Sequence, residues 1–246
     1  MHSFKELTID FANYLAKENF PAEPSGLYQP GTYFLSLGGK RVRPVMCLMG
    51  NELFGDIHVD AYFAGTAIEL FHNFTLIHDD IMDAAALRRG METVHIKYGQ
   101  NAALLTGDVM MIKAYEYLSK MNIEHLQKIF PLFNTTAVEV CEGQQLDMDF
   151  ENRDDINMDE YIHMISLKTS VLLAASLEIG AIIGGASEGS RKNLYEFGRN
   201  LGIAFQIQDD YLDAFGNPVK FGKEVGGDIR QNKKTFLMLI KLIIIH

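Results

Sequence analysis

Apolar residues recur at helical spacing along most of this chain of 246 residues. Neither the alternation typical of strands nor a two-residue hairpin signal is present, so the pattern predicts helices without a sheet. The segments with helical spacing are 7–17, 45–54, 59–83, 102–121, 126–150, 158–183, 192–215 and 235–245. Polar or glycine-bearing segments separate them at 84–100, 151–157, 184–190 and 216–232. We therefore expect one all-α domain over residues 1–246, a bundle whose site is built from side chains on facing helices.

Two of these segments end in the same acidic pentad, Asp-Asp-x-x-Asp. The aspartates are Asp79, Asp80 and Asp83 in the first pentad and Asp209, Asp210 and Asp213 in the second. Residues four apart stack on one helix face, where like charges repel unless a cation binds between them. Mg²⁺ takes oxygen ligands and usually binds through carboxylates plus substrate phosphates, so the two pentads suggest a metal-bridged diphosphate. One pentad alone is more often a solvated helix end, and the surrounding residues must decide.

Basic residues surround both pentads. The cations in question are Lys40, Arg41, Arg43, Arg88, Arg89, Lys168, Lys223, Lys233 and Lys234. Arginine binds phosphate oxygens through a fork of donors and lysine as a point charge, so these residues suit a diphosphate. For Arg41 and Lys234 we favour an ordinary surface position. For Lys168 a surface position fits poorly, because apolar residues surround it in the sequence.

Composition restricts the partners and the compartment. The net charge of −10 argues against nucleic acid. No apolar run is long enough to span a bilayer, and the first residues lack the apolar core of a signal peptide. The two cysteines, Cys47 and Cys141, stand singly and suit a reducing compartment. We therefore expect a cytoplasmic protein without a membrane span.

Seven motifs follow one another between Pro24 and Leu239, namely GGKRVRP, HNFTLIHDDIMD, LRRGMETVH, GQQLDMDF, KTS, FQIQDDYLD and GKEVGGDIRQNKKT. In this order they resemble the motifs of the trans-isoprenyl diphosphate synthases, the polyprenyl synthetase family that includes farnesyl and geranylgeranyl diphosphate synthases. The resemblance implies a large antiparallel helical bundle around a deep central cavity. It also implies a homodimer and a cluster of about three Mg²⁺ ions bound with an allylic diphosphate.

The resemblance further implies a role for each matching residue. Those that would bind isopentenyl diphosphate are Lys40, Arg43, His72 and Arg89, with Phe205 beside the isopentenyl group. Those that would hold the allylic diphosphate are Arg88, Lys168 and Lys223, and Lys233 is a further substrate-binding lysine. Thr169 and Gln206 would stabilise the allylic cation with their oxygens. The simpler alternative for His72 is a core histidine that bonds to a neighbour such as Glu69.

The implied reaction is a condensation of isopentenyl diphosphate with dimethylallyl, geranyl or farnesyl diphosphate. It proceeds by metal-assisted ionisation, condensation and proton elimination, and the proton goes to the released pyrophosphate. In the family, a bulky aromatic residue five positions before the first aspartate stops chain growth early, and Phe74 holds that position. With Phe71 and Thr75 it would form the floor of the cavity. We expect a farnesyl or geranylgeranyl product and favour geranylgeranyl.

Two other functions are compatible with parts of the sequence. The chain stops at His246, where family members continue through further helices, so we expect a domain without its usual C-terminal helices. A non-catalytic partner subunit would explain this, but such subunits commonly lose pentad aspartates and this chain keeps all six. A class I terpene cyclase also uses one such pentad, but it has no use for the basic loop at residues 38–44. We favour the prenyltransferase.

Overall fold

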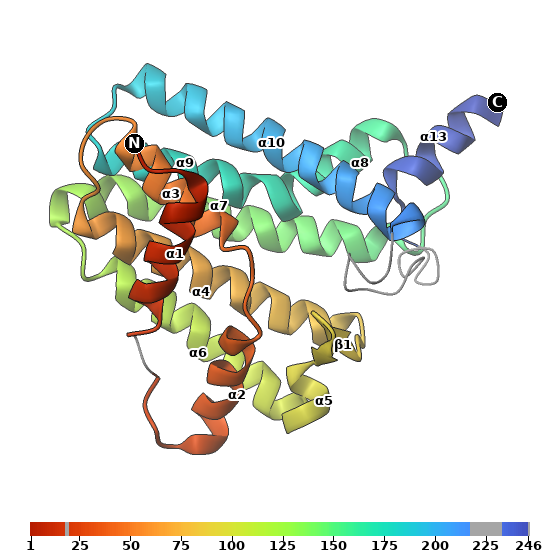
Figure 1. The fold of residues 1–246 in the computed structure, drawn as a ribbon. Coiled ribbons are helices and arrows are strands. Elements are labelled where there is room, and N and C mark those ends of the chain that lie inside the picture. Colours follow the sequence, from red (N-terminus) through yellow and green to blue (C-terminus); the bar gives the residue numbers. More distant parts are fainter. Residues whose placement is uncertain (18–19, 217–232, 246) are drawn as a thin grey trace. The chain divides into compact units, whose positions relative to one another are not determined.

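The computed structural model describes residues 1–17, 20–216 and 233–245, with side chains up to residue 240 (Figure 1). These residues form two compact units. The first comprises Met1–Phe130 and Ser176–Arg191, and the second comprises Pro131–Ala175 and the described part of Lys192–His246. The single domain over residues 1–246 and its deep central cavity stay predictions.

Helices make up most of the described residues, which confirms the all-α class (Figure 1). The earlier helices are α1 (Phe4–Leu15), α2 (Ser25–Ser36), α3 (Val42–Glu52), α4 (Val59–Met82), α5 (Val94–Tyr98) and α6 (Gln100–Leu118). The later ones are α7 (Ile123–Phe150), α8 (Met158–Ile165), the π-helix η1 (Ser166–Ser170), α9 (Val171–Ile183), α10 (Glu188–Phe215) and α13 (Phe236–Ile245). Each of the eight predicted segments overlaps at least one of these helices.

Helix α2 was not predicted, because Pro30 and Gly31 lie in its interior and both residues disfavour helix. Packing compensates for this local preference. Pro30, Gly31 and Phe34 are buried. A Cβ atom added at Gly31 would lie 3.3 Å from the methyl carbon of Met110 on α6, so the glycine permits close contact between α2 and α6.

The expectation of no hairpin is wrong. Strand β1 (Leu87–Arg88) pairs antiparallel with strand β2 (Met91–Glu92). The two turn residues, Arg89 and Gly90, have positive φ angles of 54° and 77°. Positive φ at both positions matches the right-handed twist of the strands, although a non-glycine residue is unusual there. The turn directs two consecutive arginines to different partners, as described below.

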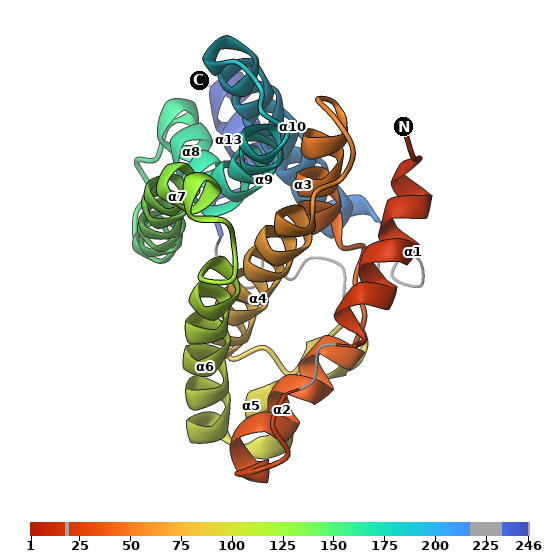
Figure 2. The same ribbon diagram turned by 90° about the vertical axis from the view of Figure 1, so that its left-hand side faces the viewer.

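In the first unit, α4 lies alongside α6 (Figure 2), and α3 packs on α4. Glycine allows α4 and α6 to approach closely, because a Cβ atom at Gly107 of α6 would be 2.4 Å from Nε2 of His78 on α4. A buried cluster joins α2, α4, α5 and α6, and it consists of Phe34, Ile77, Val94, Ala103 and Met110. This packing holds the end of α4 that carries the first pentad.

In the second unit, the π-helix η1 lies against two helices. A Cβ atom at Gly143 of α7 would be 2.2 Å from the backbone nitrogen of Lys168. On α10, a Cβ atom at Gly202 would be 2.6 Å from Cα of Ser170. The apolar core of this unit consists of Phe150, Ile156, Tyr161, Met164, Ile165 and Leu239. Glycine therefore lets α7 and α10 approach η1 closely, and π-helical turns often mark functional positions.

One described segment, Met158–Ile183, is long and apolar enough to cross a membrane by length and composition. In the structure 72% of its most apolar window is buried inside the protein. A helix that is apolar on all sides is buried in a core or in a membrane, and burial here accounts for the composition. The absence of a membrane span stays a prediction.

Candidate functional site

The two pentads share one arrangement, in which the second aspartate is buried and held by the protein. Asp80 is 1% exposed and Asp210 is 5% exposed, whereas Asp79 and Asp209 are half-buried. Arg88 holds the Asp80 carboxylate: its Nε lies 2.8 Å from Oδ1 and 2.9 Å from Oδ2, and its Nη2 lies 2.7 Å from Oδ1. The first strand of the hairpin therefore anchors the first pentad.

Asp210 is held by three donors of the second unit. Its Oδ1 accepts from Gln206 Nε2 at 3.0 Å, and its Oδ2 accepts from Tyr161 Oη at 2.7 Å and from the Phe236 N–H at 2.9 Å. Both oxygens of this carboxylate therefore have protein donors. The second aspartates orient their pentads, and their predicted role as metal ligands stays a prediction.

The electrostatics of the pentads fit a divalent cation. Burial raises the pKa of Asp80 to about 6, although Arg88 acts in the opposite direction. Burial also raises the pKa of Asp210, against the hydrogen bonds from Tyr161, Phe236 and Gln206. Both carboxyl groups are thus harder to ionise than a free aspartate, and a nearby cation would favour the ionised form. The donors are all oxygen atoms, which is the set that Mg²⁺ prefers.

A basic cluster lies near the first pentad in the first unit. Arg43 Nη1 is 3.1 Å from His72 Nε2. Because arginine only donates, Nε2 of His72 accepts and Nδ1 carries the proton. Burial lowers the pKa of His72 well below its usual value, and Arg43 and Arg88 lower it further. His72 is therefore a neutral donor. The neighbour that His72 contacts is Arg43 and not Glu69, which accepts from Asn73 Nδ2 at 2.8 Å and pairs with Arg41. Both roles predicted for His72, phosphate binding and a core hydrogen bond, stay predictions.

The expected surface positions of Arg41 and Lys234 are also wrong. The Arg41 side chain is 9% exposed, forms an ion pair with Glu69 and donates to the Leu35 carbonyl at 3.0 Å. Lys234 is buried, with Nζ 3.3 Å from Asp154 Oδ1. A charged residue that finds a partner distant in sequence can be buried, and helical spacing does not reveal such partners.

Arg89 completes the basic cluster. It donates to the Gly38 carbonyl, and a Cβ atom at Gly39 would be 3.0 Å from its Nη2. Gly39 has a φ of 144°, so the loop uses the freedom of glycine where Arg89 crosses it. Lys40 lies exposed in the same loop. Arg43 and His72 are thus in contact, and Arg89 meets the loop that precedes Arg43. Their binding of isopentenyl diphosphate stays a prediction.

The second unit contains a cluster that includes one residue missed from the sequence. Thr169 Oγ1 donates to Gln206 Oε1 at 3.1 Å, so η1 is linked through Gln206 to the second pentad. Lys168 Nζ donates to Asp147 Oδ2 at 2.5 Å, and Lys233 Nζ lies 3.6 Å from the same oxygen. Burial alone would raise the pKa of Asp147, but the two lysines outweigh burial and hold it below its usual value.

The position of Asp147 follows from its spacing only once the structure shows that Gly143 meets Lys168. It follows Gly143 by four residues and therefore lies on the face of α7 that approaches Lys168. Of the other predicted residues of this group, Phe205 is exposed on α10, and Lys223 lies outside the described residues.

The predicted floor residues lie on α4. The rings of Phe71 and Phe74 are 5.5 Å apart between centroids, and Thr75 Oγ1 donates to the His72 carbonyl at 2.8 Å. The Phe74 ring also meets the edge of His78 at 4.8 Å. His78 in turn has Nε2 3.1 Å from the Leu104 carbonyl oxygen on α6. The contact between α4 and α6 therefore holds the Phe74 ring through His78.

The chain is similar to proteins of known family and structure. The family model for polyprenyl synthetase matches residues 24–243. A geranylgeranyl diphosphate synthase of Sulfolobus acidocaldarius is 42% identical over 240 residues, which are 96% of this chain and 72% of that protein. A crystal structure of a geranylgeranyl pyrophosphate synthase superposes with a TM-score of 0.93 at 54% identity and covers 97% of this chain and 73% of that one.

A more distant solved structure carries ligands. The geranyltransferase from Helicobacter pylori, complexed with magnesium and isoprenyl diphosphate, is 27% identical and superposes with a TM-score of 0.86. The match covers 99% of this chain and 86% of that one.

Proposed function

Because this chain belongs to the polyprenyl synthetase family, we propose that it condenses isopentenyl diphosphate with an allylic diphosphate to give geranylgeranyl diphosphate. The observation that carries this proposal is the pair of oxygen-only carboxylate sites, each with a buried second aspartate that the protein orients. A cation cluster accompanies each of them. The names of the relatives favour the product with twenty carbons.

The first and third aspartates of each pentad would hold the metal. Asp79 and Asp83 stack four residues apart, as do Asp209 and Asp213, and Mg²⁺ is the cation that such oxygen donors select. Bound Mg²⁺ would neutralise the allylic diphosphate and assist the departure of pyrophosphate. Arg88 would orient the first pentad, and Gln206 would orient the second through Asp210.

The basic cluster of Arg43, His72 and Arg89 would bind isopentenyl diphosphate, with Lys40 at the exposed edge of the loop. His72 accepts from Arg43 at Nε2, so its Nδ1–H is available to donate to a phosphate oxygen. A neutral imidazole provides this hydrogen bond without adding charge, while the arginines supply the positive charge. The cluster would hold the nucleophilic double bond in line with the allylic carbon, which is a large part of the catalysis.

Lys168, Lys233 and Thr169 would act on the allylic substrate. The two lysines share Asp147, which fixes the position of their ammonium groups, and both would act on the diphosphate as point charges. Thr169 and Gln206 present oxygen atoms that can stabilise an allylic cation. We propose no protein base, because the released pyrophosphate can take the proton.

Incorporation of radiolabelled isopentenyl diphosphate tests this function. The protein is supplied with Mg²⁺ and with dimethylallyl, geranyl or farnesyl diphosphate in turn, and the products are sized. We expect extension of each starter to one length, geranylgeranyl diphosphate, and none with EDTA. No incorporation by protein whose circular dichroism shows the helical fold would overturn the proposal.

The chain-length floor gives a further prediction. Replacing Phe74 by alanine removes the ring that contacts Phe71 and His78, and the freed volume should admit about one more isoprene unit. We therefore expect products longer than geranylgeranyl diphosphate by chromatography of the labelled chains. Phe197→Ala, which removes an exposed phenylalanine of α10, should leave the product length unchanged. Unchanged length in Phe74→Ala would remove Phe74 from the floor.

The pKa of Asp80 predicts a pH dependence. Its value of about 6 in the folded protein lies above the usual 3.8, so the neutral carboxyl group is favoured by folding. The stability that Asp80 contributes is present at low pH and is lost as the pH rises through about 6. Without metal, thermal unfolding of the wild type should therefore lose stability relative to Asp80→Asn between about pH 4 and 6. If the stabilities of the two proteins changed with pH in parallel, the raised pKa of Asp80 would be contradicted.

We also propose a homodimer in the cytoplasm. Helix α6 exposes Leu105 and Ile112, which are seven residues apart and therefore lie on one face. An exposed apolar face of this kind suits a subunit interface. A reducing compartment fits the two free cysteines, Cys47 and Cys141.

A further inference from the structure

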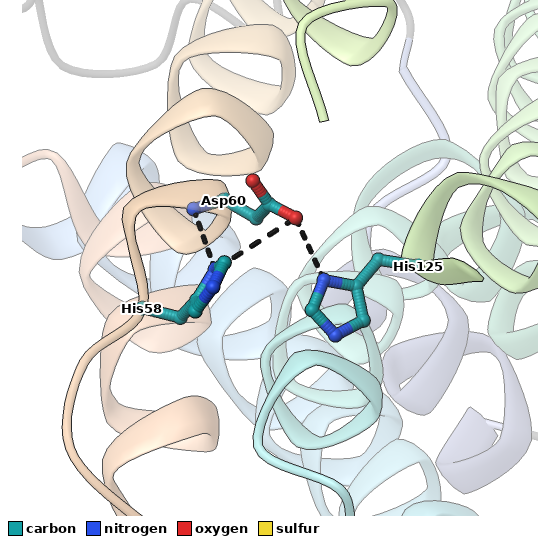
Figure 3. Close-up of side chains that lie close together, drawn as sticks. All are labelled: His58, Asp60 and His125. Atoms are coloured by element: carbon teal, nitrogen blue, oxygen red, sulfur yellow. Dashed lines mark hydrogen bonds and ion pairs between the residues drawn. The ribbon is translucent and has the colours of Figure 1, made fainter. Parts of the chain in front are cut away.

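A second group of metal-ligating side chains lies in the first unit, away from the first pentad. His58, Asp60 and His125 converge where the N-terminus of α4 meets the first turn of α7 (Figure 3). Asp60 and Asp79 belong to the same helix, and at about 1.5 Å per residue they are about 28 Å apart along its axis. The proposed reaction uses none of these three side chains.

The three side chains present their ligand atoms to one another. His125 Nδ1 is 2.7 Å from Asp60 Oδ2, and His58 Nδ1 is 3.7 Å from the same oxygen. The two imidazole rings meet edge to face, with centroids 5.3 Å apart. One nitrogen or oxygen atom from each residue lies within 4.8 Å of the others. A metal ion would need only small movements to bind all three, since ligands around a tetrahedral ion are about 3.3 Å apart.

The protein holds this group in place from both sides. Asp60 is buried, with a side chain 4% exposed, and its Oδ2 also accepts from the Asn122 N–H at 3.0 Å. His58 is the N-cap of α4, and its Nδ1 accepts from the Asp60 N–H at 3.1 Å. Asn51 Oδ1 accepts from the His58 N–H at 2.8 Å. The ligands are therefore largely positioned before any ion binds.

Solvent reaches the group from the histidine side. The His58 side chain is 47% exposed and that of His125 is 22% exposed. An ion could thus enter without unfolding the helices and would keep water in its remaining coordination positions. Three protein ligands with an open position are the pattern of zinc sites that exchange their fourth ligand.

We propose that His58, Asp60 and His125 form a binding site for a divalent transition metal ion of the Zn²⁺ type. Imidazole nitrogen suits Zn²⁺, Cu²⁺ and Ni²⁺, whereas Mg²⁺ prefers oxygen donors only. The pentads and this group therefore select different ions. On binding, the ion replaces the proton on His125 Nδ1, which is released to water. The lone pair of His58 Nδ1, which accepts from the Asp60 N–H, then binds the ion instead. The bound ion links α4 to α7 and stabilises the folded chain.

Two variants separate metal binding from hydrogen bonding. His58→Asn keeps a preferred N-cap side chain for α4 but removes an imidazole. His125→Gln keeps an amide donor for Asp60 but removes the other imidazole. His163→Gln, which changes an exposed histidine of α8, is the matched control. Each protein is first checked for an unchanged melting temperature in EDTA and for basal prenyltransferase activity, so that failure of the proposed function is recorded separately.

Thermal unfolding with saturating Mg²⁺, with and without Zn²⁺, is the test. At about 100 times its Kd, Zn²⁺ should raise the melting temperature of the wild type and of His163→Gln by about 5 °C. His58→Asn and His125→Gln should lose most of this shift. No shift in the wild type, or equal shifts in all four proteins, would overturn the proposal and leave the group as a hydrogen-bonded clamp.

Electron paramagnetic resonance of bound Cu²⁺ tests the two histidine ligands even if His125→Gln fails to fold. Two coupled nitrogen nuclei are expected in the spectrum of the wild type, and one in that of His58→Asn. Oxygen-only pentads cannot produce this coupling. The same nitrogen coupling in the wild type and in His58→Asn would contradict the assignment.

Discussion

Replacing Asp80 by asparagine should lower kcat/KM for the condensation by about 10³-fold, or about 4 kcal/mol of transition-state stabilisation. The substitution removes a charge from the first pentad and replaces one of the two oxygens that accept from Arg88 by an amide nitrogen, which cannot accept. Arg88 would then be free to turn toward Asp79, whose Oδ2 already lies 3.6 Å from its Nη2. The pentad would lose negative charge and orientation together. Steady-state kinetics at saturating Mg²⁺ measure the effect.

The fold of this variant should be preserved. Asparagine removes a buried charge whose ionisation burial disfavours, so above about pH 6 the melting temperature should not fall. Asp56→Asn, which neutralises an exposed carboxylate of the first unit, should keep nearly wild-type kinetics. If Asp80→Asn were as active as Asp56→Asn, the first pentad would have no part in the reaction.

Replacing Gly143 by alanine should lower both stability and activity. The added Cβ atom would lie 2.2 Å from the Lys168 nitrogen and 2.6 Å from its Cα. These are backbone atoms, so no side-chain rotation can relieve the contact, and the cost should be about 3 kcal/mol in the free energy of unfolding. The π-helix η1 must move away from α7. A displacement of about 1 Å at Lys168 and Thr169 should reduce activity about 10²-fold.

Gly189→Ala is the matched control for this substitution. Gly189 also lies in a helix, but nothing lies within 4 Å of its added Cβ atom. Alanine there should stabilise the helix by up to about 1 kcal/mol and leave kcat unchanged. Chemical denaturation and the incorporation assay are applied to both variants. Wild-type stability and activity in Gly143→Ala would show that α7 does not approach η1 this closely.

The sequence predicts the helices where local pattern and packing agree. Segment 59–83 has helical spacing throughout and forms α4, whose end carries the first pentad. Helix α2 escapes prediction because Pro30 and Gly31 oppose it locally, and burial against α6 compensates. The hairpin at Arg89 and Gly90 escapes for a related reason, since each strand has only two residues.

The partners of charged residues are the least predictable part of the site. Motif order led to His72, Arg43 and Lys168, but neither spacing nor composition shows which side chains they contact. Arg41 is partly buried because Glu69 lies 28 residues away in sequence but beside it in the fold. Asp147 likewise meets Lys168 from 21 residues away. Such contacts depend on helix packing, which a single sequence does not specify.

If the pentads bind the allylic diphosphate through divalent cations, the two ligands must strengthen each other's binding by the same factor. Isothermal titration of geranyl S-thiolodiphosphate, an unreactive analogue, with and without Mg²⁺ measures this coupling. We expect Mg²⁺ to lower the Kd of the analogue by about 100-fold in the wild type. The effect should be lost in Asp80→Asn and in Asp209→Asn. Equal affinity with and without Mg²⁺ would contradict binding of the diphosphate through metal at the pentads.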